Sequence, residues 1–554
     1  MAAPRKRKRS VSSTEPASSS FFTTLEPEAP AAEFAAATPY QHVQLPSIVK
    51  QPLLLRVREE LGLLASTFKE TDLFKVYQTG DLANLDPENA EHAAALPATI
   101  ALRSALYSER FRSFVRKVTG CAPLTGQQDC SCNVYRRGGH LLCHDDVIGT
   151  RCVSYILYLS RPGKRWHSQL GGALELYELS EGRSGDVLPA PVRSLAPEFG
   201  TMVLFTVQPG ISYHSVQEVG SKEPRLAISG WFHAKLPPTG ADSTASLAQL
   251  RGQLQSNAGE LPKPRPIRRL PQPQRGLTPK DVERMKHIIN PAYLQPQTVS
   301  AVRAQLAQNG AALLASFLKP TLARAIAEKA RKCDAKDGLD ARRIPPHEAG
   351  TQRKCWRLIG PPQLRRYLRF RPGGRLKPYS ADEVLLSRLH GVRSSLGSTL
   401  DEIRVVFHSP PFIQLMSALS GLAPTACASE VRRFRPGLDY TLAHVGTQRV
   451  GPTLDATLAF VPSAPADLAL WDSGDVGGFE CHVESSVEDE HGAAEVYRSS
   501  DDSAGVMSIH AANNALSLVM RKPDAMKFVK YVSAAAPGSR WDVAAEYSCA
   551  PPVQ

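Results

Sequence analysis

A proline-rich segment near the middle of the chain separates two stretches that must each build a hydrophobic core. Residues 236–278 open with LPPTGADSTAS and close with LPKPRPIRRLPQPQRG. Proline at this density favours an extended, semi-rigid spacer. Because a chain of 554 residues is also too long for a single core, we predict two to three domains, with residues 236–278 as a linker.

Both flanking stretches show helices first and short strands after them. Before the linker, apolar residues recur at helical spacing over 52–68 and 97–119, as in amphipathic helices. The strand-like runs that follow are Cys132–Arg136, Cys152–Ser160, Ala173–Glu178, Met202–Gln208 and Leu226–Phe232. After the linker, helices are expected around 279–288 and 297–332. The later strand-like runs are Glu430–Phe434, Asp439–His444, Thr457–Phe460, Gly478–Val483, Gly505–Ile509 and Ala515–Arg521. Such spacing favours a sandwich or barrel, and the repeated order suggests a duplicated fold.

The N-terminal tail has a different composition. Residues 1–45 are rich in Ala, Ser, Pro and Thr, and we predict that they are disordered. The basic run Arg5–Arg9 is typical of a nuclear import signal; the alternative is a solvated tail without a function. The segment lacks the apolar centre of a secretory signal, so we expect the protein in the nucleus and cytoplasm.

The net charge and the cysteines limit which partners and which compartment we expect for the protein. The formal net charge is +13, which suits an anionic partner such as nucleic acid, a ribosome or an acidic protein, although a basic tail and scattered arginines also explain it. The ten cysteines form no C-x-x-C pair, so we expect free thiols in a reducing compartment. No apolar run is long enough to predict a membrane span.

The segment LLCHDDVIG contains the most informative pattern in the sequence. It places His144 and Asp146 two residues apart, and side chains two apart on a strand point to the same face. Asp145 points the other way on such a strand. One imidazole and one carboxylate make two thirds of a facial metal triad. The later segment VQPGISYHSVQEV supplies the third candidate ligand, His214, after the expected turn at Pro209–Gly210.

These ligand types predict a particular chemistry. Two imidazoles and a carboxylate bind Fe(II) on one face and leave three positions open, enough for a 2-oxoacid and O2. Arg225, at the head of RLAISGWF, can grip the far carboxylate of the 2-oxoacid, and Tyr158 can donate a hydroxyl to it. A metal enzyme without 2-oxoglutarate is the alternative, but it leaves Arg225 without a role. We interpret His140 as a neighbour of the site or, at most, a substrate contact, and His167 and His233 have no ligand-like companions.

Longer motifs in both halves of the chain show that the sequence resembles the ribosomal prolyl 3,4-dihydroxylases. Before the linker the resemblance rests on FKETDLFKVYQTGDLANL, LLCHDDVIGTRCVSYILYL, GGALELYEL and RLAISGWFH. After it, the resemblance rests on INPAYL, WRLIGPP, EVRRFRPGLDYTLAH and MKFVKYV. It implies a mainly β, α+β fold of two tandem double-stranded β-helix (jelly-roll) domains with flanking helices. The implied catalytic domain is 46–235 and the non-catalytic one is 279–554.

The resemblance also implies an activity and its site. Its pattern makes His144, Asp146 and His214 the iron ligands and makes Arg225 and Tyr158 the 2-oxoglutarate contacts. Related sequences often have a small hydroxyl residue where this chain has Ala227. The implied reaction is hydroxylation of a proline in a small-subunit ribosomal protein with Fe(II), 2-oxoglutarate, O2 and L-ascorbate, which affects translation accuracy or termination. The alternative is a binding regulator of translation or oxygen-responsive transcription that acts through the C-terminal domain.

The stretch after the linker is expected to lack this chemistry. Its run DYTLAHVG carries His444, but the residue two further on is Gly446, so no carboxylate completes a pair. This domain is therefore expected to be a scaffold or a binding surface. The Arg-dense stretch 342–393 suits contact with RNA phosphates; the alternatives are a solvated face and an internal ion-pair network.

Overall fold

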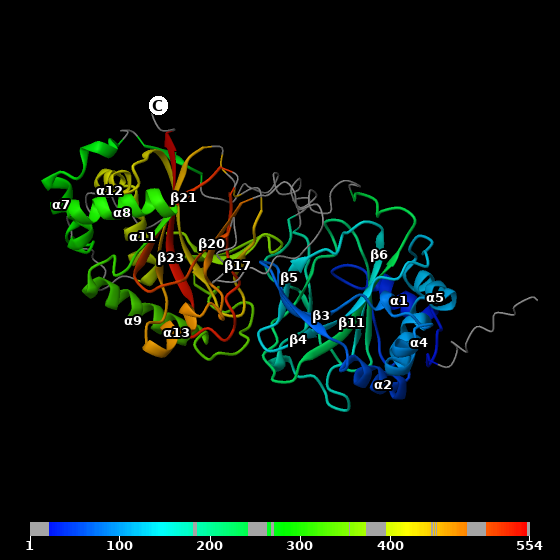
Figure 1. Ribbon diagram of the computed structural model, residues 1–554. Helices are drawn as coiled ribbons and strands as arrows, with labels where there is room; N and C mark the ends of the chain where they lie inside the picture. Colours follow the sequence, from blue (N-terminus) through cyan, green and yellow to red (C-terminus); the bar gives the residue numbers. More distant parts are fainter. Residues whose placement is uncertain are drawn as a thin grey trace, which may run out of the picture.

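The computed structural model describes residues 21–550 except 181–185, 242–262, 268–270, 354, 373–394, 445–446, 448, 450, 485–505 and 524. The chain forms two parts that lie side by side (Figure 1). We call residues 21–241 the N-terminal part and residues 263–550 the C-terminal part. In each part most of the helices lie toward the end far from the other part, and the strands lie toward the middle of the molecule.

The N-terminal part is built on one large antiparallel sheet. Its helices are α1 (Glu28–Ala36), α2 (Gln51–Leu61), α3 (Ala90–Ala95), α4 (Pro97–Leu106) and α5 (Glu109–Thr119). Its strands are β1 (His42–Leu45), β2 (Ser66–Glu70), β3 (Phe74–Thr79), β4 (Cys130–Tyr135), β5 (His140–His144), β6 (Arg151–Tyr158), β7 (Leu174–Leu176), β8 (Arg193–Leu195), β9 (Met202–Thr206), β10 (His214–Val216) and β11 (Arg225–His233). The strand order is β1-β9-β6-β11-β4-β3-β5-β10-β7-β8, with β2 paired to β3.

The C-terminal part also centres on a large antiparallel sheet. Its helices are α7 (Pro279–Met285), α8 (Pro296–Asn309), α9 (Pro320–Asp337), α11 (Leu396–Phe407), α12 (Pro410–Ser420) and α13 (Pro465–Asp472). Its strands are β12 (Arg265–Pro266), β13 (Ala311–Leu314), β14 (Trp356–Ile359), β15 (Arg365–Phe370), β16 (Ala423–Phe434), β17 (Tyr440–Thr441), β18 (Thr453–Phe460), β19 (Glu480–Glu484), β20 (Val506–Ile509), β21 (Ala515–Arg521), β22 (Ala525–Val529) and β23 (Arg540–Ala550). The main order is β13-β21-β18-β23-β16-β15-β14, and a second sheet runs β20-β19-β22.

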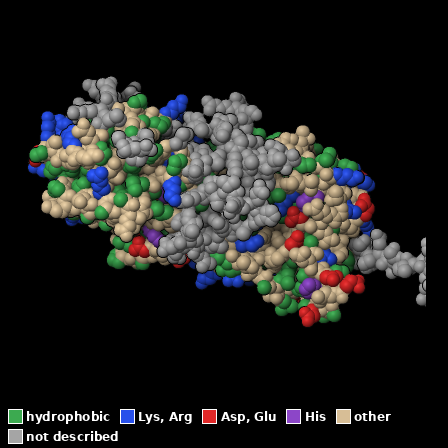
Figure 2. Space-filling view, turned by 45° about the horizontal axis from the view of Figure 1, so that its top comes forward, with side chains coloured by type: hydrophobic (Ala, Val, Ile, Leu, Met, Phe, Trp, Pro, Cys, Tyr) green, Lys and Arg blue, Asp and Glu red, His purple; other side chains and the backbone are tan. Residues whose placement is uncertain are grey.

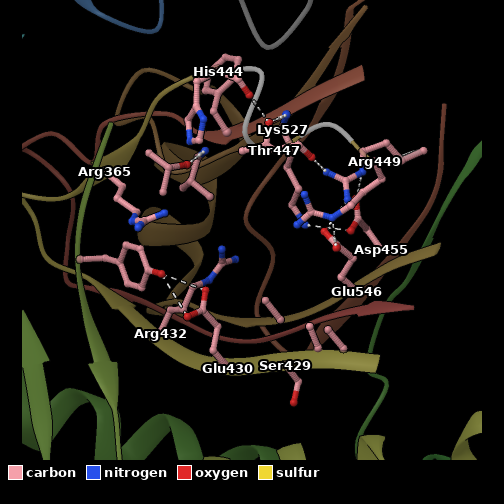
Figure 3. A pocket seen from close by; sticks show the side chains of 18 residues that line it. Arg365, Ser429, Glu430, Arg432, His444, Thr447, Arg449, Asp455, Lys527 and Glu546 are labelled. Carbon is pink, nitrogen blue, oxygen red and sulfur yellow. Dashed lines mark hydrogen bonds and ion pairs between the residues drawn. The ribbon is translucent and has the colours of Figure 1, made fainter. Parts of the chain in front are cut away.

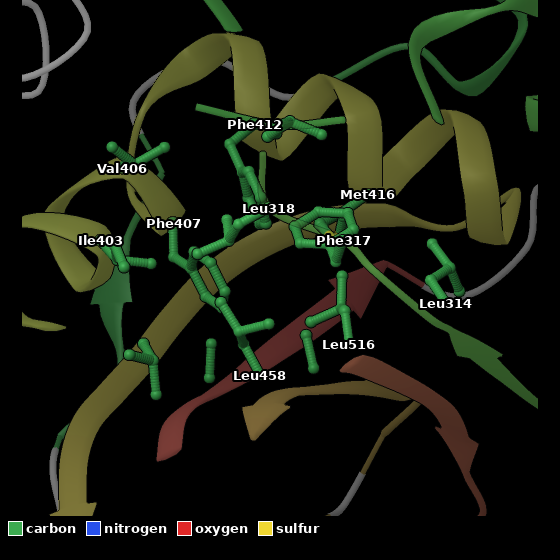
Figure 4. Packing of buried hydrophobic residues seen from close by; sticks show 14 of the residues in the cluster. Leu314, Phe317, Leu318, Ile403, Val406, Phe407, Phe412, Met416, Leu458 and Leu516 are labelled. Carbon is green, nitrogen blue, oxygen red and sulfur yellow. The ribbon is translucent and has the colours of Figure 1, made fainter. Parts of the chain in front are cut away.

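Each part has its own hydrophobic core. In the N-terminal part the apolar faces of the helices, including Leu54 and Val57 of α2, pack against the sheet. In the C-terminal part α11 and α12 cover the sheet (Figure 4), and Phe407 stacks on Phe412 with ring centroids 4.3 Å apart. Full burial of such side chains contributes about 1.5–3 kcal/mol each. These two cores lie on either side of the proline-rich segment.

The tail prediction is wrong for residues 21–45. This segment forms α1 and β1, and β1 pairs with β9. Phe22 stacks on Phe111 of α5 with ring centroids 4.7 Å apart, and Phe34 is buried. These aromatic anchors outweigh the Ala- and Pro-rich composition, because each buries a large apolar area. The Arg5–Arg9 run lies outside the described residues.

Two predicted helices are interrupted. The helix expected over 97–119 is split into α4 and α5, because Ser108 adopts an extended conformation and its hydroxyl caps α5 by accepting from Phe111 N. The helix expected over 297–332 ends at Gly310, whose φ of +71° terminates α8 before β13. The described part of the linker also has structure: Arg265 and Pro266 form β12 and pair with β16, and Pro273–Arg275 form one turn of 3-10 helix.

The two parts are joined by buried polar contacts. Glu218 accepts hydrogen bonds from Ser533 Oγ (2.6 Å) and Ala534 N (2.7 Å), and Glu175 Oε1 lies 2.7 Å from His347 Nε2. The ring of His140 lies 4.3 Å from that of Tyr531. Buried charges need such partners, so these contacts fix how the parts pack.

The Arg-dense stretch contains buried arginines on β15, exposed arginines such as Arg342, Arg343 and Arg357, and residues that the structure does not describe. Arg365, Arg366 and Arg369 are at most 5% exposed, so these three do not form a surface for RNA phosphates. Residues 373–393 of the stretch lie outside the described residues. Over the described part of the face in Figure 2, Lys and Arg are dispersed among apolar and acidic side chains. The described helices include none with the length and apolarity to cross a membrane.

Candidate functional site

His144 and His214 meet because two distant strands pair. His144 ends β5 and His214 begins β10, and the two residues are direct partners across the antiparallel ladder. Their ring centroids lie 4.2 Å apart. The register of one strand pair therefore brings together two imidazoles that are 70 positions apart in the sequence.

Asp146 completes the group. Its Oδ1 lies 3.3 Å from His144 Nε2, and its Oδ2 lies 3.4 Å from His214 Nε2. One ligand atom from each residue lies within 4.8 Å of the others. The structure thus brings together the three residues that the sequence predicted as metal ligands.

The local reason for this meeting differs from the prediction. β5 ends at His144, and Asp146 lies beyond it with a φ of +62°, so the two residues do not share a regular strand face. Asp is among the residues that tolerate this left-handed conformation. Ser154 Oγ (3.1 Å) and Trp231 Nε1 (3.0 Å) both donate to Asp146 Oδ2 and hold the carboxylate in place.

Backbone carbonyls orient both imidazoles. His144 Nδ1 lies 2.8 Å from Leu142 O, and His214 Nδ1 lies 2.9 Å from Ser212 O. A carbonyl only accepts, so each Nδ1 carries the proton and each Nε2 keeps its lone pair for a metal ion. This arrangement is the one that metal-binding histidines use.

Burial and mutual attraction set the electrostatics of the trio. Burial alone would raise the pKa of Asp146, but the neighbouring His214 and His144 imidazoles hold that pKa well below its usual range. Burial also opposes charge on His144, yet the Asp146 carboxylate raises its pKa. The site therefore concentrates negative charge where two nitrogen ligands converge, and a divalent cation suits it.

Arg225 and Tyr158 lie together in the same part of the sheet. Arg225 Nε donates to Gly172 O at 2.8 Å, while its Nη2 is buried without a hydrogen-bond partner. The Tyr158 hydroxyl is also buried without a partner, and the guanidinium carbon lies 5.1 Å from the Tyr158 ring centroid. Unsatisfied buried donors are costly, so this pair is arranged for an acceptor such as a carboxylate. Ala227 pairs directly with Tyr158.

Sequence reasoning missed several residues of the site. Tyr135 pairs directly with Arg225 across β4 and β11, and its ring centroid lies 5.0 Å from the guanidinium. Trp231 lies six residues after Arg225 on β11, so period-two alternation places both on one face. That alternation is a signal that could have identified Trp231. No local pattern identifies Tyr135, because its position depends on strand register.

Asp145 has a supporting role that was also missed. Its Oδ2 accepts from Gly210 N at 3.2 Å, and its backbone carbonyl accepts from Ser212 Oγ at 3.2 Å. Both partners lie in the turn that precedes His214. Asp145 therefore fixes this turn to the loop that carries Asp146.

Of the other histidines considered as ligands, His140 and His233 have structural partners. His140 is buried against Tyr531, and burial, with Lys530 next, lowers its pKa to about 3. His233 Nε2 lies 3.2 Å from Asp129 Oδ2, and His167 is exposed. Among the residues that the structure describes, only His144, Asp146 and His214 form a group able to hold a metal.

The residues fit Fe(II) and a 2-oxoacid. Two imidazole nitrogens and one carboxylate form the donor set that non-haem Fe(II) oxygenases use. The buried unpartnered atoms on Arg225 and Tyr158 suit the far carboxylate of the 2-oxoacid. Fold and site together define a 2-oxoglutarate- and Fe(II)-dependent oxygenase.

Comparison with known proteins agrees and narrows the class. Residues 130–233 match the 2OG-Fe(II) oxygenase superfamily, and residues 280–551 match the family "Oxoglutarate and iron-dependent oxygenase degradation C-term". The prolyl 3,4-dihydroxylase OGFOD1 of Ostreococcus tauri is 39% identical over 92% of this chain and 95% of that protein. The prolyl 3-hydroxylases OGFOD1 of Mus musculus and Xenopus laevis are 26% and 27% identical, over 89% and 90% of this chain and 85% and 84% of those proteins. The chain belongs to the OGFOD1 family of prolyl hydroxylases.

Proposed function

We propose that this protein hydroxylates a prolyl residue of a small-subunit ribosomal protein. The observation that carries the proposal is the buried His144, Asp146 and His214 trio beside the unpartnered donors of Arg225 and Tyr158. Membership of the OGFOD1 family supports prolyl hydroxylation, since the relatives are named for it. The choice of a ribosomal protein is the expectation from the sequence resemblance.

In this proposal each residue has a defined task. His144, Asp146 and His214 hold Fe(II) through one atom each and leave three positions open. Bound iron supplies the oxidative chemistry that uses 2-oxoglutarate and O2, and L-ascorbate keeps the metal reduced. Trp231 and Ser154 orient the Asp146 carboxylate, and the Leu142 and Ser212 carbonyls fix the imidazole tautomers.

Arg225 and Tyr158 hold the far carboxylate of 2-oxoglutarate. Arg225 Nη2 forms a charge-assisted hydrogen bond, which is stronger than a neutral one, and Tyr158 donates its hydroxyl. Burial raises the pKa of Tyr158, although Arg225 opposes this, so the phenol keeps its proton at neutral pH. With Ala227 in place of a hydroxyl residue, Tyr158 is the neutral donor beside Arg225.

Two exposed apolar side chains suit a peptide substrate. Ile148 is 50% exposed in the loop after Asp146, and Ile211 is 39% exposed in the turn before His214. Both loops are tied together by Asp145. We propose that they contact the apolar ring of the substrate proline.

The domain plan is also a proposal. Each part would be one double-stranded β-helix, with the catalytic domain over 46–235 extended by residues 21–45 and the non-catalytic domain over 279–554. The Arg5–Arg9 run motivates a nuclear as well as a cytoplasmic location. Effects on translation accuracy or termination would follow from modification of the ribosome.

The test is a reaction with purified full-length protein. Fe(II), L-ascorbate and 2-oxoglutarate are supplied with proline-containing peptides that cover small-subunit ribosomal proteins, and products are followed by mass spectrometry and succinate release. We expect hydroxylated proline in step with succinate. A protein that releases succinate but never modifies a ribosomal peptide would contradict the substrate. Survival of the cellular phenotype in a His144→Ala, Asp146→Ala double variant would favour a binding regulator.

A further inference from the structure

A cavity lies inside the C-terminal part, far from the trio in the chain. It has a volume of about 110 Å³, is partly open, and is lined by residues of β15, β16, β17, β18, β21, β22 and β23 and of the loop after β17 (Figure 3). A single water needs roughly 10–15 Å³ of such space. The cavity therefore has room for a small molecule.

Most charged groups in the wall are neutralised by carboxylates. Asp542 binds Arg432 through two hydrogen bonds of 2.7 and 3.1 Å. Asp455 lies 3.2 Å from Arg521. In Figure 3, Arg449 and Glu546 are joined on one side of the cavity. These groups form an internal ion-pair network of the kind that buried charges require.

Arg365 is the exception in the wall. It is 3% exposed, and its Nε donates to Gly360 O at 2.9 Å, but Nη2 is buried without a hydrogen-bond partner. Among the ion pairs of the described residues, none joins Arg365 to a carboxylate. A buried guanidinium without a counter-ion is unfavourable, so this side chain is arranged for an anion.

His444 offers a second unpartnered group to the same space. It is 9% exposed, and its Nδ1 has no hydrogen-bond partner. Burial first, then Arg365 and Arg449, lower its pKa to about 4, so the imidazole is neutral at physiological pH. In Figure 3, His444, Arg365 and Arg432 point toward the open centre from different sides.

The arrangement parallels that of Arg225 and Tyr158. In both parts an arginine is anchored through Nε to a glycine carbonyl, its Nη2 is unpartnered, and a neutral side chain has an unpartnered polar atom nearby. We propose that the C-terminal cavity binds a small organic carboxylate, which pairs with Arg365 and accepts a hydrogen bond from His444.

The rest of the wall favours a carboxylate over phosphate. Glu430, Asp455 and Glu546 also line the cavity, and they repel a phosphate group, which brings two charges to Arg365, more than a carboxylate group, which brings one. Val529 and Ala545 supply apolar surface for a carbon chain. Since the described residues around the cavity hold no metal-binding trio, this binding does not require iron.

The test is calorimetric titration of succinate into the full-length protein after removal of metal with a chelator. We expect succinate to bind. The Arg365→Ala variant should bind it about ten- to hundredfold more weakly, because one charge-assisted hydrogen bond is lost. Arg225→Ala removes any contribution of the N-terminal site and should leave this binding in place. Arg357→Ala, an exposed arginine of β14, is the matched control. His444→Ala, expected to weaken binding about tenfold, serves if Arg365→Ala does not fold.

Three results would overturn the proposal. The first is that neither succinate nor 2-oxoglutarate binds the metal-free protein at millimolar concentration. The second is that binding depends on Arg225 and is unchanged in both the Arg365→Ala and His444→Ala variants. The third is that inorganic phosphate binds through Arg365 more tightly than succinate does.

Discussion

Both parts of this molecule are built on a large antiparallel sheet, but among the described residues only the N-terminal part gathers metal ligands. In the N-terminal part, the register of β5 and β10 places His144 beside His214, and a left-handed residue returns the Asp146 carboxylate to them. In the C-terminal part a cavity is lined by arginines and carboxylates, several of which pair with one another. A large antiparallel sheet is therefore not enough for metal chemistry, which depends on a few side chains at strand ends.

The largest expected effect comes from removing a metal ligand. His214→Ala should reduce prolyl hydroxylation more than about a hundredfold, since loss even of groups that merely support a ligand costs about 10–100-fold. Turnover is measured as hydroxylated peptide. His510→Ala, in the C-terminal part, is the control and should retain activity. An equal loss of activity in both variants would contradict the assignment of catalysis to the N-terminal part.

Removing the arginine beside the trio should have a smaller and more selective effect. Arg225→Ala should raise the KM for 2-oxoglutarate about ten- to hundredfold, because a charge-assisted hydrogen bond is lost. Iron affinity should change little. Arg225→Lys should restore activity only in part, because an ammonium cannot reproduce the planar fork. An unchanged KM for 2-oxoglutarate in the Arg225→Ala variant would contradict a role for Arg225 in binding the co-substrate.

A substitution at Trp231 tests whether its hydrogen bond to the Asp146 carboxylate supports iron binding. Trp231→Phe removes the hydrogen bond to Asp146 Oδ2 and keeps a ring of similar shape. We expect iron affinity to fall about tenfold, measured by anaerobic titration, with little change in the folded structure. Trp166→Phe, whose Nε1 donates to Gly171 O instead, is the matched control. Identical affinities in the two variants would contradict this role.

The prediction with the smallest expected effect on activity concerns the contact between the two parts. Burial and Lys530 lower the pKa of His140 to about 3, so the folded protein binds fewer protons there than the unfolded chain. Stability is complete above the ordinary histidine pKa of about 6.5 and is lost as pH falls toward 3. From pH 6.5 to 5 this residue should lower the free energy of unfolding by about 2 kcal/mol.

Denaturant unfolding at several pH values measures this effect. His140→Phe should flatten the acid side of the stability profile, while His167→Gln, at an exposed position, should leave it unchanged. A profile that keeps its slope in His140→Phe would assign the acid sensitivity to other groups.

The sequence allowed most of the fold and the trio to be predicted, for identifiable physical reasons. Apolar periodicity located α2, and spacing plus ligand chemistry identified His144, Asp146 and His214. The sequence did not predict that residues 21–45 are folded, because Phe22 and Phe34 stabilise this segment through contacts with distant elements. The buried role of Arg365 was missed as well, since sequence alone does not distinguish a solvated arginine from one inside a sheet. Such properties arise from register and packing.

Stoichiometric titration of Fe(II) under anaerobic conditions tests the central contrast most directly. The full-length protein should bind one iron per chain, and Asp146→Ala should bind none, since the C-terminal part offers no ligand trio among its described residues. A second iron per chain, or one that still binds to the Asp146→Ala protein, would contradict the account.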